Sequence, residues 1–460
     1  MELLTFSLIA SAMGLGYLFV GYQTSKTIGS TTDFFLAGKN VGIFGLTMSL
    51  IATQIGGGAI LGTSQEAYSY GLLAFAYITG IAIGFILLAS SFAHRIRAQN
   101  VHTIAQIFEK RYGSPFLTKV ASIASITSLG GILVAQIVGS RALLLSMNLY
   151  TPILFISLWA VVITYTMMGG LKAVISNNAF QLLVILIVFI ILFFIDLIIS
   201  PNIPASIPTA FQLSKQLPDA VIRFLTIAIT PTLYCLFEQD IAQTIIAAKN
   251  QKTVFWGTTL AAASMVTFAY LPFYFGIQAR NTPLLEAAIS SGAQPLMSLI
   301  AHKYSILVQL LVLYGILAAI LSTANSLLCA ISAHVTEDFH LNNIYSHSRA
   351  NLIIPKLVTL FIGSIAFILA QSSENILNII ILSYQIPIAT IFVPIMGAYL
   401  LKKVSSAAAY ACVITGLIGY LGTIMNILPF WGIWGSIGLS TLLFIIINPL
   451  QTTQYSHEIN

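Results

Sequence analysis

Hydroxyl and amide side chains interrupt an otherwise apolar helix in the second half of the chain. The stretch 315–338 (GILAAILSTANSLLCAISAHVTED) is long enough to cross a membrane, yet its middle holds Ser322, Thr323, Asn325 and Ser326. Small residues fill most other positions and allow close helix approach, while hydroxyls at bilayer depth need an internal partner or a ligand. This helix is the candidate working centre of a bundle. Alternatively, each hydroxyl donates to a carbonyl three or four residues earlier.

Three consecutive glycines interrupt a second apolar segment. Gly56 to Gly58 follow the polar pair Thr53 and Gln54 within a span expected near 43–70. One glycine in a helix interior costs about 1 kcal/mol, so three in a row predict a break. Broken backbone at membrane depth is tolerated where it lines a cavity. A glycine-rich face for close helix packing is the alternative.

A third segment, near 221–247, is interrupted in the same way. It carries Pro231, Thr232, Tyr234, Glu238, Gln239 and Asp240. It begins a second group of five helices as the glycine-rich segment begins the first, and the two groups have opposite membrane orientation. Interrupted helices at corresponding places in two halves predict an inverted repeat with its binding site near the membrane midplane.

The composition of the chain predicts which kind of secondary structure positions these residues. The 460 residues are 58% hydrophobic and 7% charged, with a mean hydropathy of +0.94. So few charges exclude a soluble domain and predict an all-α polytopic membrane protein. About 13 transmembrane helices are expected, near 3–22, 43–70, 72–93, 117–148, 150–168, 173–199, 221–247, 253–278, 304–333, 351–371, 374–400, 405–425 and 428–449. The chain reads as one integral membrane domain, 1–460, with an extra N-terminal helix (1–22), core repeats over about 30–400 and two C-terminal helices (405–449).

The net charge of +6 is scattered over helix ends, which favours membrane topology over nucleic-acid binding. If the first helix runs outside to inside, inside loops carry 14 of the 19 basic residues: Lys26, Lys39, Arg95, Arg97, Lys110, Arg111, Lys119, Lys172, Lys249, Lys252, Arg349, Lys356, Lys402 and Lys403. We therefore expect a multi-pass protein of the cell (inner) membrane with its N-terminus outside and its C-terminus in the cytoplasm. The first segment lacks a basic leader and a cleavage site, which predicts a retained helix.

No motif brings a nucleophile, a base and metal ligands together, so we expect no enzyme, no catalytic residue and no cofactor. Cys235, Cys329 and Cys412 lie in apolar spans without metal-type spacing and are interpreted as small core residues. A membrane sensor that kept a transporter fold and a channel are the other classes. The short tail after the last helix disfavours the sensor, and the lack of a repeated filter disfavours the channel.

Several motifs together resemble the sodium:solute symporter family, which includes proline, pantothenate, iodide and sugar symporters. DFFLAGK resembles its opening signature, SLIATQIGGGAILGTSQEAYSYG its first core helix, MMGGLKAVISNNAFQ its GG-x-x-AV turn, EQDIAQTIIAAKN its sixth core helix and AAILSTANSLLCAISAHVTED its eighth. The similarity runs in unbroken order from about residue 30 to 340. It implies a leucine-transporter-type inverted five-helix-repeat core and symport of Na⁺ with a small polar organic solute by alternating access.

The resemblance also implies a sodium site. Its ligands would be the backbone carbonyls of Ala52, Ile55 and Ala319 and the hydroxyls of Ser322 and Thr323. The residue types agree, because Na⁺ is a hard cation that prefers oxygen ligands and unwinding frees carbonyls. Ala319 lies three and four positions before the two hydroxyls, so all three share one helix face.

The solute is expected beside the breaks. The candidate residues are Gln54, Gly56, Gly57, Gln136, Tyr234, Glu238, Tyr384 and Gln385. Tyr and Gln in a bundle also serve helix–helix contacts, which is the alternative for each. The partners expected are the solute, Na⁺ and the lipid bilayer, with the monomer as the functional unit.

Two features leave the coupling open. Glu238 and Asp240 are buried acids that a proton-coupled transporter would titrate, unless they pair with Lys249 or Arg223. Asn177 and Asn178 stand where relatives have Asp, and Thr244 where they have Arg. These departures affect the expected path by which ligands leave toward the inside and the number of ions coupled to each solute, but not the expected ion site. The identity of the solute stays open among proline, pantothenate, monocarboxylates and sugars, with a small zwitterion or carboxylate mildly favoured.

Overall fold

The computed structural model describes residues 2–199, 217–290, 292–341, 352–372, 376–425, 427–428 and 432–457, and these ranges contain helices without a β-strand. The first half comprises α1 (Glu2–Ser25), α2 (Thr31–Leu36), α3 (Ile43–Gln54), η2 (Gly58–Gly62), α4 (Thr63–Tyr70), α5 (Phe75–Leu87), α6 (Ala93–Ala98), α7 (Gln106–Tyr112), α8 (Pro115–Ser146) and α9 (Pro152–Ile199). The second half comprises α11 (Leu217–Cys235), α12 (Gln239–Ile246), α13 (Gln251–Arg280), α14 (Glu286–Ser290), α15 (Pro295–Lys303), α16 (Ile306–Ala333), η7 (His334–Asp338), α17 (Ile353–Leu369), α18 (Ile376–Thr390), α19 (Phe392–Leu400), α20 (Ser406–Ile424) and α21 (Gly432–His457). The all-α prediction is confirmed.

Local sequence fixes where several helices begin. Ser114 caps α8 by accepting a hydrogen bond from the Leu117 N–H, and Pro115 follows at the first helical position. Asn250 caps α13 in the same way. Such caps satisfy N–H groups that have no partner within the helix.

One glycine bends the longest helix. The spans expected at 150–168 and 173–199 form the single element α9, which turns sharply at Gly170 (φ 51°, ψ −148°). A Cβ at Gly170 would lie 2.3 Å from the Phe34 carbonyl oxygen. Only glycine tolerates both this backbone conformation and this approach.

By length and hydropathy, seven helices in the described residues can span a membrane, or eight if α18 and α19, bent by 54° at their junction, form one span. The expected number of about 13 is therefore not confirmed. The breaks divide expected spans into short pieces such as α3 and α12, and α9 contains two helices that meet at the Gly170 kink, over the two expected spans.

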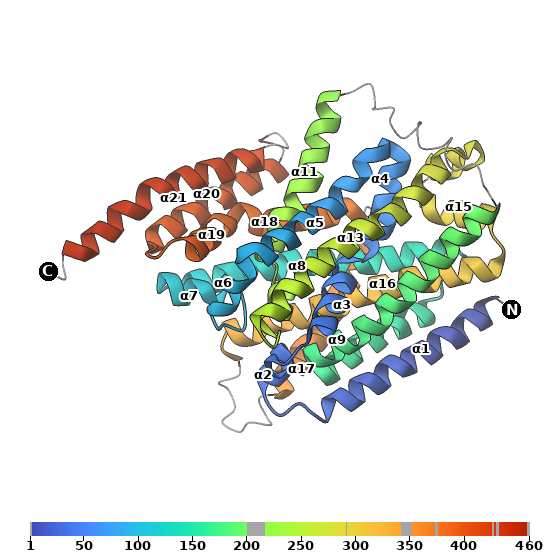
Figure 1. The fold of residues 1–460 in the computed structure, drawn as a ribbon, viewed down its shortest axis with the longest axis horizontal. Helices are drawn as coiled ribbons and strands as arrows, with labels where there is room; N and C mark the ends of the chain where they lie inside the picture. The colour runs from blue at the N-terminus through green and yellow to red at the C-terminus, as the bar shows by residue number, and fades with distance from the viewer. Residues whose placement is uncertain are drawn as a thin grey trace.

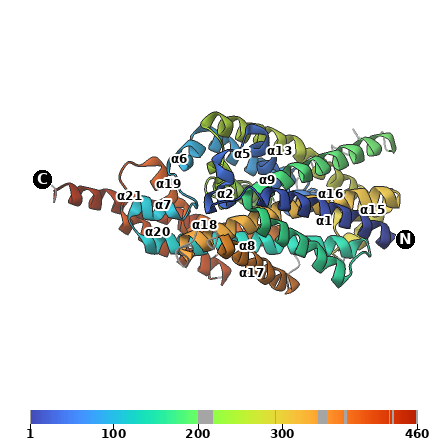
Figure 2. The same ribbon diagram turned by 90° about the horizontal axis from the view of Figure 1, so that it is seen from below.

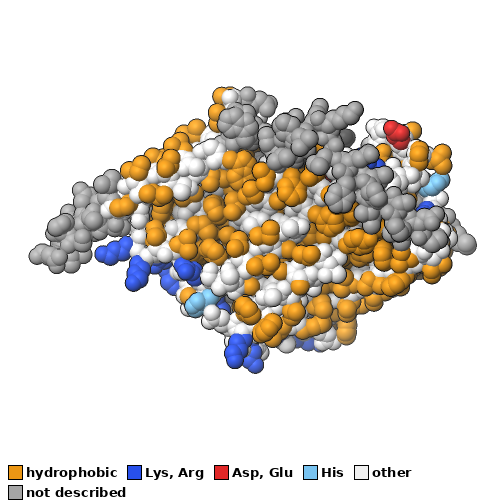
Figure 3. All heavy atoms as spheres, turned by 45° about the horizontal axis from the view of Figure 1, so that its top comes forward, with side chains coloured by type: hydrophobic (Ala, Val, Ile, Leu, Met, Phe, Trp, Pro, Cys, Tyr) orange, Lys and Arg blue, Asp and Glu red, His pale blue; other side chains and the backbone are white. Residues whose placement is uncertain are grey.

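The bundle has one long axis, and the N- and C-termini lie at its opposite ends (Figures 1 and 2). The outer surface is largely apolar, with most visible Lys and Arg side chains gathered at the end where the C-terminus lies (Figure 3). At the centre, α16 packs chiefly on α9 and α8, and its side chains from Val312 to Ala333 are all buried. The extra helix α1 lies against α9, while α20 and α21 pack together beside α18. The helix with the hydroxyl cluster is therefore the core of the molecule.

Candidate functional site

The glycine-rich segment is broken, as predicted. Helix α3 ends at Gln54, and Ile55 leaves the helical conformation at φ −85° and ψ 68° before helical structure resumes at Gly58. A Cβ at Gly56 would lie 2.5 Å from Thr323 Oγ1. The break therefore brings the α3 backbone directly against the hydroxyl cluster of α16.

The hydroxyls of α16 bind carbonyls on both helices. Ser322 Oγ lies 2.7 Å from the Ala52 carbonyl oxygen and 2.8 Å from that of Ala319. Thr323 Oγ1 lies 2.7 Å from the Thr53 carbonyl oxygen and 3.2 Å from that of Ala319. Hydroxyl and carbonyl oxygens from two helices thus form one compact, buried group of hard ligands, the kind that Na⁺ requires.

Most of the predicted ligand set is brought together. Ala52, Ala319, Ser322 and Thr323 are linked by these hydrogen bonds, and Ile55 is fully buried as the first residue past α3. The back-bonding alternative is also present, because both hydroxyls reach the Ala319 carbonyl, but each has a second partner across the helix interface. The predicted set did not include the Thr53 carbonyl, which also contacts Thr323. Its position beside the predicted break could have suggested it.

A polar cluster continues from this group along α3 and α16. Thr53 Oγ1 and Ser326 Oγ lie 2.8 Å apart, and the Asn178 side-chain amide donates to Ser326 Oγ at 3.1 Å and Ser49 Oγ at 3.2 Å. Both side-chain polar atoms of Asn177 are buried without a hydrogen-bond partner. Asn178, one of the two asparagines that stand where relatives usually have Asp, therefore lies directly next to the hydroxyl group.

The second predicted break is also present. Helix α11 ends at Cys235 and α12 begins at Gln239, with Glu238 extended between them (φ −63°, ψ 127°). Gln54 Nε2 donates to Glu238 Oε2 at 3.2 Å, so side chains at the two breaks meet. Thr244 donates to the Asp240 carbonyl within α12 at 2.8 Å.

Aromatic side chains pack beside the breaks. The Tyr234 and Tyr384 rings stack with centroids 4.5 Å apart. The Tyr77 and Tyr384 hydroxyls lie 3.1 Å apart, and Ser128 donates to the Tyr234 hydroxyl at 2.9 Å. Tyr77, on α5, was not predicted from sequence.

One pocket is lined by residues of both breaks. Its lining comprises Thr53, Gln54, Gly56, Gly58, Ala59, Tyr77, Ile132, Gln136, Glu238, Asp240, Thr323, Leu327, Ile380 and Tyr384. Five predicted solute residues are in this set: Gln54, Gly56, Gln136, Glu238 and Tyr384. Gly57 lies at its edge, donating to Gln136 Oε1 at 2.8 Å, and Tyr234 lies behind Tyr384. Gln385 is buried but is not part of the lining. The cavity is about 10 Å³, room for roughly one water molecule, so the pocket is contracted in this conformation.

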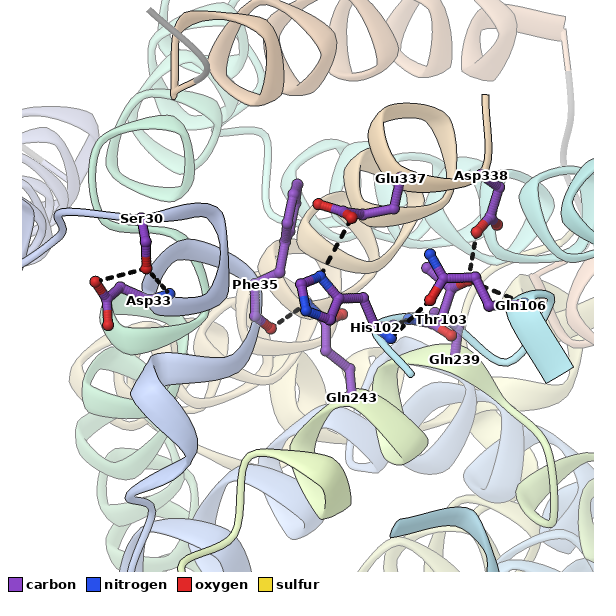
Figure 4. A network of polar contacts seen from close by, with 10 residues as sticks. All are labelled: Ser30, Asp33, Phe35, His102, Thr103, Gln106, Gln239, Gln243, Glu337 and Asp338. Carbon is purple, nitrogen blue, oxygen red and sulfur yellow. Dashed lines mark hydrogen bonds and ion pairs between the residues drawn. The ribbon is translucent and has the colours of Figure 1, made fainter. Parts of the chain in front are cut away.

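One end of the bundle is closed by a polar network that ties four segments together (Figure 4). Thr103 Oγ1 donates to Asp338 Oδ1 at 2.5 Å, and His102 Nδ1 lies 3.2 Å from Glu337 Oε2. Gln239 accepts from the Ile104 N–H at 2.8 Å, and Gln243 donates to the Phe35 carbonyl at 2.6 Å. We call this set, centred on residues 99–106, the loop closure. It joins α2, α12 and η7 at the end opposite the N-terminus.

Comparison with known proteins gives a consistent picture. The model of the sodium:solute symporter family matches residues 34–416. The chain is 24% identical over 447 residues to a sodium/pantothenate symporter of Escherichia coli, covering 92% of this chain and 91% of the relative. It is 23% identical over 434 residues to a sodium/proline symporter of Haemophilus influenzae, covering 88% and 85%. A solved structure of a Na⁺-coupled sialic acid symporter superimposes with a TM-score of 0.76 at 17% identity, covering 98% of each chain.

Proposed function

The chain belongs to the sodium:solute symporter family, and we propose that the Na⁺ it couples to binds at the junction of α3 and α16. The protein is a multi-pass membrane protein and a sodium-coupled symporter of the leucine-transporter-type fold. The proposed ligands are the carbonyls of Ala52, Ile55 and Ala319 and the hydroxyls of Ser322 and Thr323.

One observation carries this proposal: the hydroxyl pair of α16 bridges to carbonyls in the last turn of α3. Ser322 Oγ is within 2.8 Å of carbonyls from both helices. A dehydrated Na⁺ needs several oxygens converging from different directions, and these two helix segments provide them. Because the ligands come from separate helices, binding would hold α3 against α16 and bias the protein toward one conformation.

Sodium entry supplies enough free energy for accumulation. One Na⁺ moving inward gains about 2.3 kcal/mol per 100 mV, and a tenfold gradient adds about 1.4 kcal/mol. Together, about 3.7 kcal/mol supports an accumulation of a neutral solute of several hundredfold. We propose inward transport of a small polar organic solute across the cell (inner) membrane, by a monomer with no cofactor and no enzymatic activity.

The proposed solute position is the pocket between the breaks. It borders Thr323 on one side and Glu238 on the other, so ion and solute would share one wall. In this arrangement each ligand stabilises the conformation that the other needs, which is the requirement for coupling.

A panel of radiolabelled solutes in proteoliposomes, with and without an inward Na⁺ gradient, tests the symport. Replacing both Ser322 and Thr323 by alanine should raise the Na⁺ concentration for half-maximal uptake by about tenfold or more, since each lost ligand costs of order 1 kcal/mol. The matched control replaces Ser90 and Thr127, exposed hydroxyls that donate only to carbonyls of their own helices. Undiminished Na⁺ stimulation in the Ser322 and Thr323 double variant would refute the site.

Proton coupling is the second candidate, and the buried acids at the second break favour it. Glu238→Gln removes the titratable group, so uptake measured from acidic to alkaline pH separates the two cases. With Na⁺ coupling, uptake driven by a Na⁺ gradient needs no proton gradient in the wild type. Uptake driven by a proton gradient alone and abolished in Glu238→Gln would favour the proton.

A further inference from the structure

Two carboxyl groups lie at the second break, and both are buried. Glu238 is 2% exposed and Asp240 is 4% exposed. Glu238 accepts from Gln54, and Asp240 Oδ1 accepts from the Ile241 N–H at 3.0 Å, while Asp240 Oδ2 has no hydrogen-bond partner. Two buried carboxylates at one break are costly unless a positive charge faces them or one of them takes up a proton.

No basic side chain of the described chain supplies that charge. The pocket lining contains no Lys, Arg or His, and the ion pairs within the described residues join His102 to Glu337, Lys303 to Asp196 and His334 to Asp338. Lys249, an expected partner, is exposed.

The side chain of Arg223, the other expected partner, lies outside the described residues. Among the side chains that the structure describes, no Lys, Arg or His therefore faces the two acids.

Aromatic rings surround the same pocket. Tyr77 and Tyr384 line it together with both acids, and Tyr234 stacks on Tyr384. Aromatic faces attract organic cations, most strongly where water is excluded. Carboxylates beside tyrosine rings are thus a binding environment for an ammonium group.

We propose that the transported solute is an organic cation, bearing a quaternary ammonium or a protonated amine that faces Glu238 and Asp240. This inference rests on the proposed function, because it names the solute of the same pocket. The pocket is contracted here, so the solute takes space that Ile380 and Tyr384 of α18 fill in this conformation. We prefer this cation to the carboxylate that the sequence mildly favours, because a carboxylate would face two acids of its own sign; a zwitterion could bind only with its ammonium group toward them.

The first experiment uses the wild-type protein in proteoliposomes with an inward Na⁺ gradient. The probes are radiolabelled choline and putrescine, with neutral 3,3-dimethylbutan-1-ol, the carbon analogue of choline, and with proline and pantothenate. We expect Na⁺-dependent uptake of a cation and no competition by the carbon analogue at equal concentration. Uptake of proline or pantothenate while neither cation binds at millimolar concentration would overturn the proposal, as would failure of both cations to bind.

The second experiment removes each charge. Glu238→Gln and Asp240→Asn keep side-chain shape, and each should raise the half-saturating cation concentration by about tenfold or more, because an opposing buried charge is lost. Glu109→Gln, an exposed carboxylate on α7, is the control and should change nothing. If one of the two pocket variants does not fold, the other still tests the charge.

A third measurement separates this inference from the proposed function. Na⁺ should raise the thermal unfolding midpoint of the protein without solute, and Glu238→Gln should keep that shift while the Ser322 and Thr323 double variant loses it. A retained Na⁺ shift with no cation binding overturns the cation proposal alone. No Na⁺ shift in the wild type overturns the sodium site. If the acids instead hold a second Na⁺, the Na⁺ dependence is cooperative in the wild type and becomes non-cooperative in Glu238→Gln, which also overturns the proposal.

Discussion

At the residue scale, the close contact between the α3 break and α16 depends on the absence of a side chain at Gly56. The position of a Cβ at Gly56 lies 2.5 Å from Thr323 Oγ1 and 2.9 Å from Gln136 Oε1. Both neighbours are buried polar groups, and Gln136 is already held by the Gly57 N–H at 2.8 Å. Any side chain at Gly56 would therefore separate the oxygens that the proposed Na⁺ site needs together.

Gly56→Ala should raise the Na⁺ concentration for half-maximal uptake by about tenfold or more. Moving a ligand away from the ion costs of order 1 kcal/mol or above. Gly130→Ala is the matched control, since nothing lies within 4 Å of a Cβ there. It should leave uptake unchanged and stabilise α8 by up to about 1 kcal/mol. Sodium titrations of initial uptake rates compare the two variants, and equal behaviour would show that close approach at Gly56 is not required.

How far the site was predictable also becomes clear from particular residues. Ser322, Thr323 and the glycine run are local signals, since polar or helix-breaking residues in apolar spans point to a function. Tyr77 carries no such signal, because an aromatic residue in an apolar helix is ordinary. Tyr77 lines the pocket because it packs against Tyr384, 307 positions away in the chain. A contact over such a distance cannot be predicted from a local sequence pattern.

At the element scale, the loop closure links segments that we expect to separate when solute is released at this end. The segment 99–106 is tied to η7 through Thr103 and to α12 through Gln239. Next to it, Val41 just before α3 bonds to the chain after α12, with Val41 N–H donating to the Ala247 carbonyl at 3.0 Å. The two broken helices are therefore joined at this end and would move together.

Thr103→Val removes the hydroxyl that binds Asp338 while keeping side-chain shape. Losing one buried hydrogen bond costs about 1–3 kcal/mol, so opening at this end should become about tenfold more frequent. Cys329 is a natural reporter, because it is buried and its thiol lies 3.6 Å from Gln243 Nε2. In a background with Cys235→Ala and Cys412→Ala, N-ethylmaleimide should label Cys329 correspondingly faster.

Na⁺ should slow this labelling in the reporter background by favouring the closed conformation. Thr127→Val, which alters an exposed hydroxyl on α8, is the control. Equal labelling rates in the two valine variants would contradict a gating role for the loop closure.

A second link between elements holds the opposite end. Asp196 at the end of α9 is fully buried and forms an ion pair with Lys303 of α15, and it accepts hydrogen bonds from Tyr304 and, at 2.6 Å, from Tyr274. Partners 78 to 108 positions apart could not be inferred from sequence, where Asp196 only marked a helix end.

Lys303→Met should destabilise the protein by about 3–5 kcal/mol, because it leaves the Asp196 carboxylate buried without its counter-charge. Adding Asp196→Asn removes that charge and should restore much of the loss. Thermal unfolding of the single and double variants in detergent measures both effects. A double variant less stable than Lys303→Met would contradict this role of the pair.

At the scale of the whole molecule, apolar composition was enough to predict an all-α membrane bundle, and the two interrupted helices indicate where we propose its site. The number of spans could not be predicted in this way, because hydropathy does not reveal that the two helices of α9 are joined without a loop at the Gly170 kink or that α18 and α19 meet at 54°. Those features depend on tertiary contacts such as that between Gly170 and the Phe34 carbonyl.

The positions of the two termini turn the predicted orientation into a testable property of the whole chain. They lie at opposite ends of the bundle (Figure 1), as an odd number of crossings requires, and most visible basic side chains gather at the lower left of Figure 3. Because basic residues are retained on the cytoplasmic side, an epitope at the C-terminus should be protected from antibody in intact cells and accessible in inverted vesicles. An epitope at the N-terminus should show the reverse. If both epitopes were accessible from the same side, the chain would cross the membrane an even number of times, and the predicted orientation would be wrong. If instead the N-terminal epitope were protected and the C-terminal epitope accessible in intact cells, the loop closure would lie on the outer face and would gate access from that side.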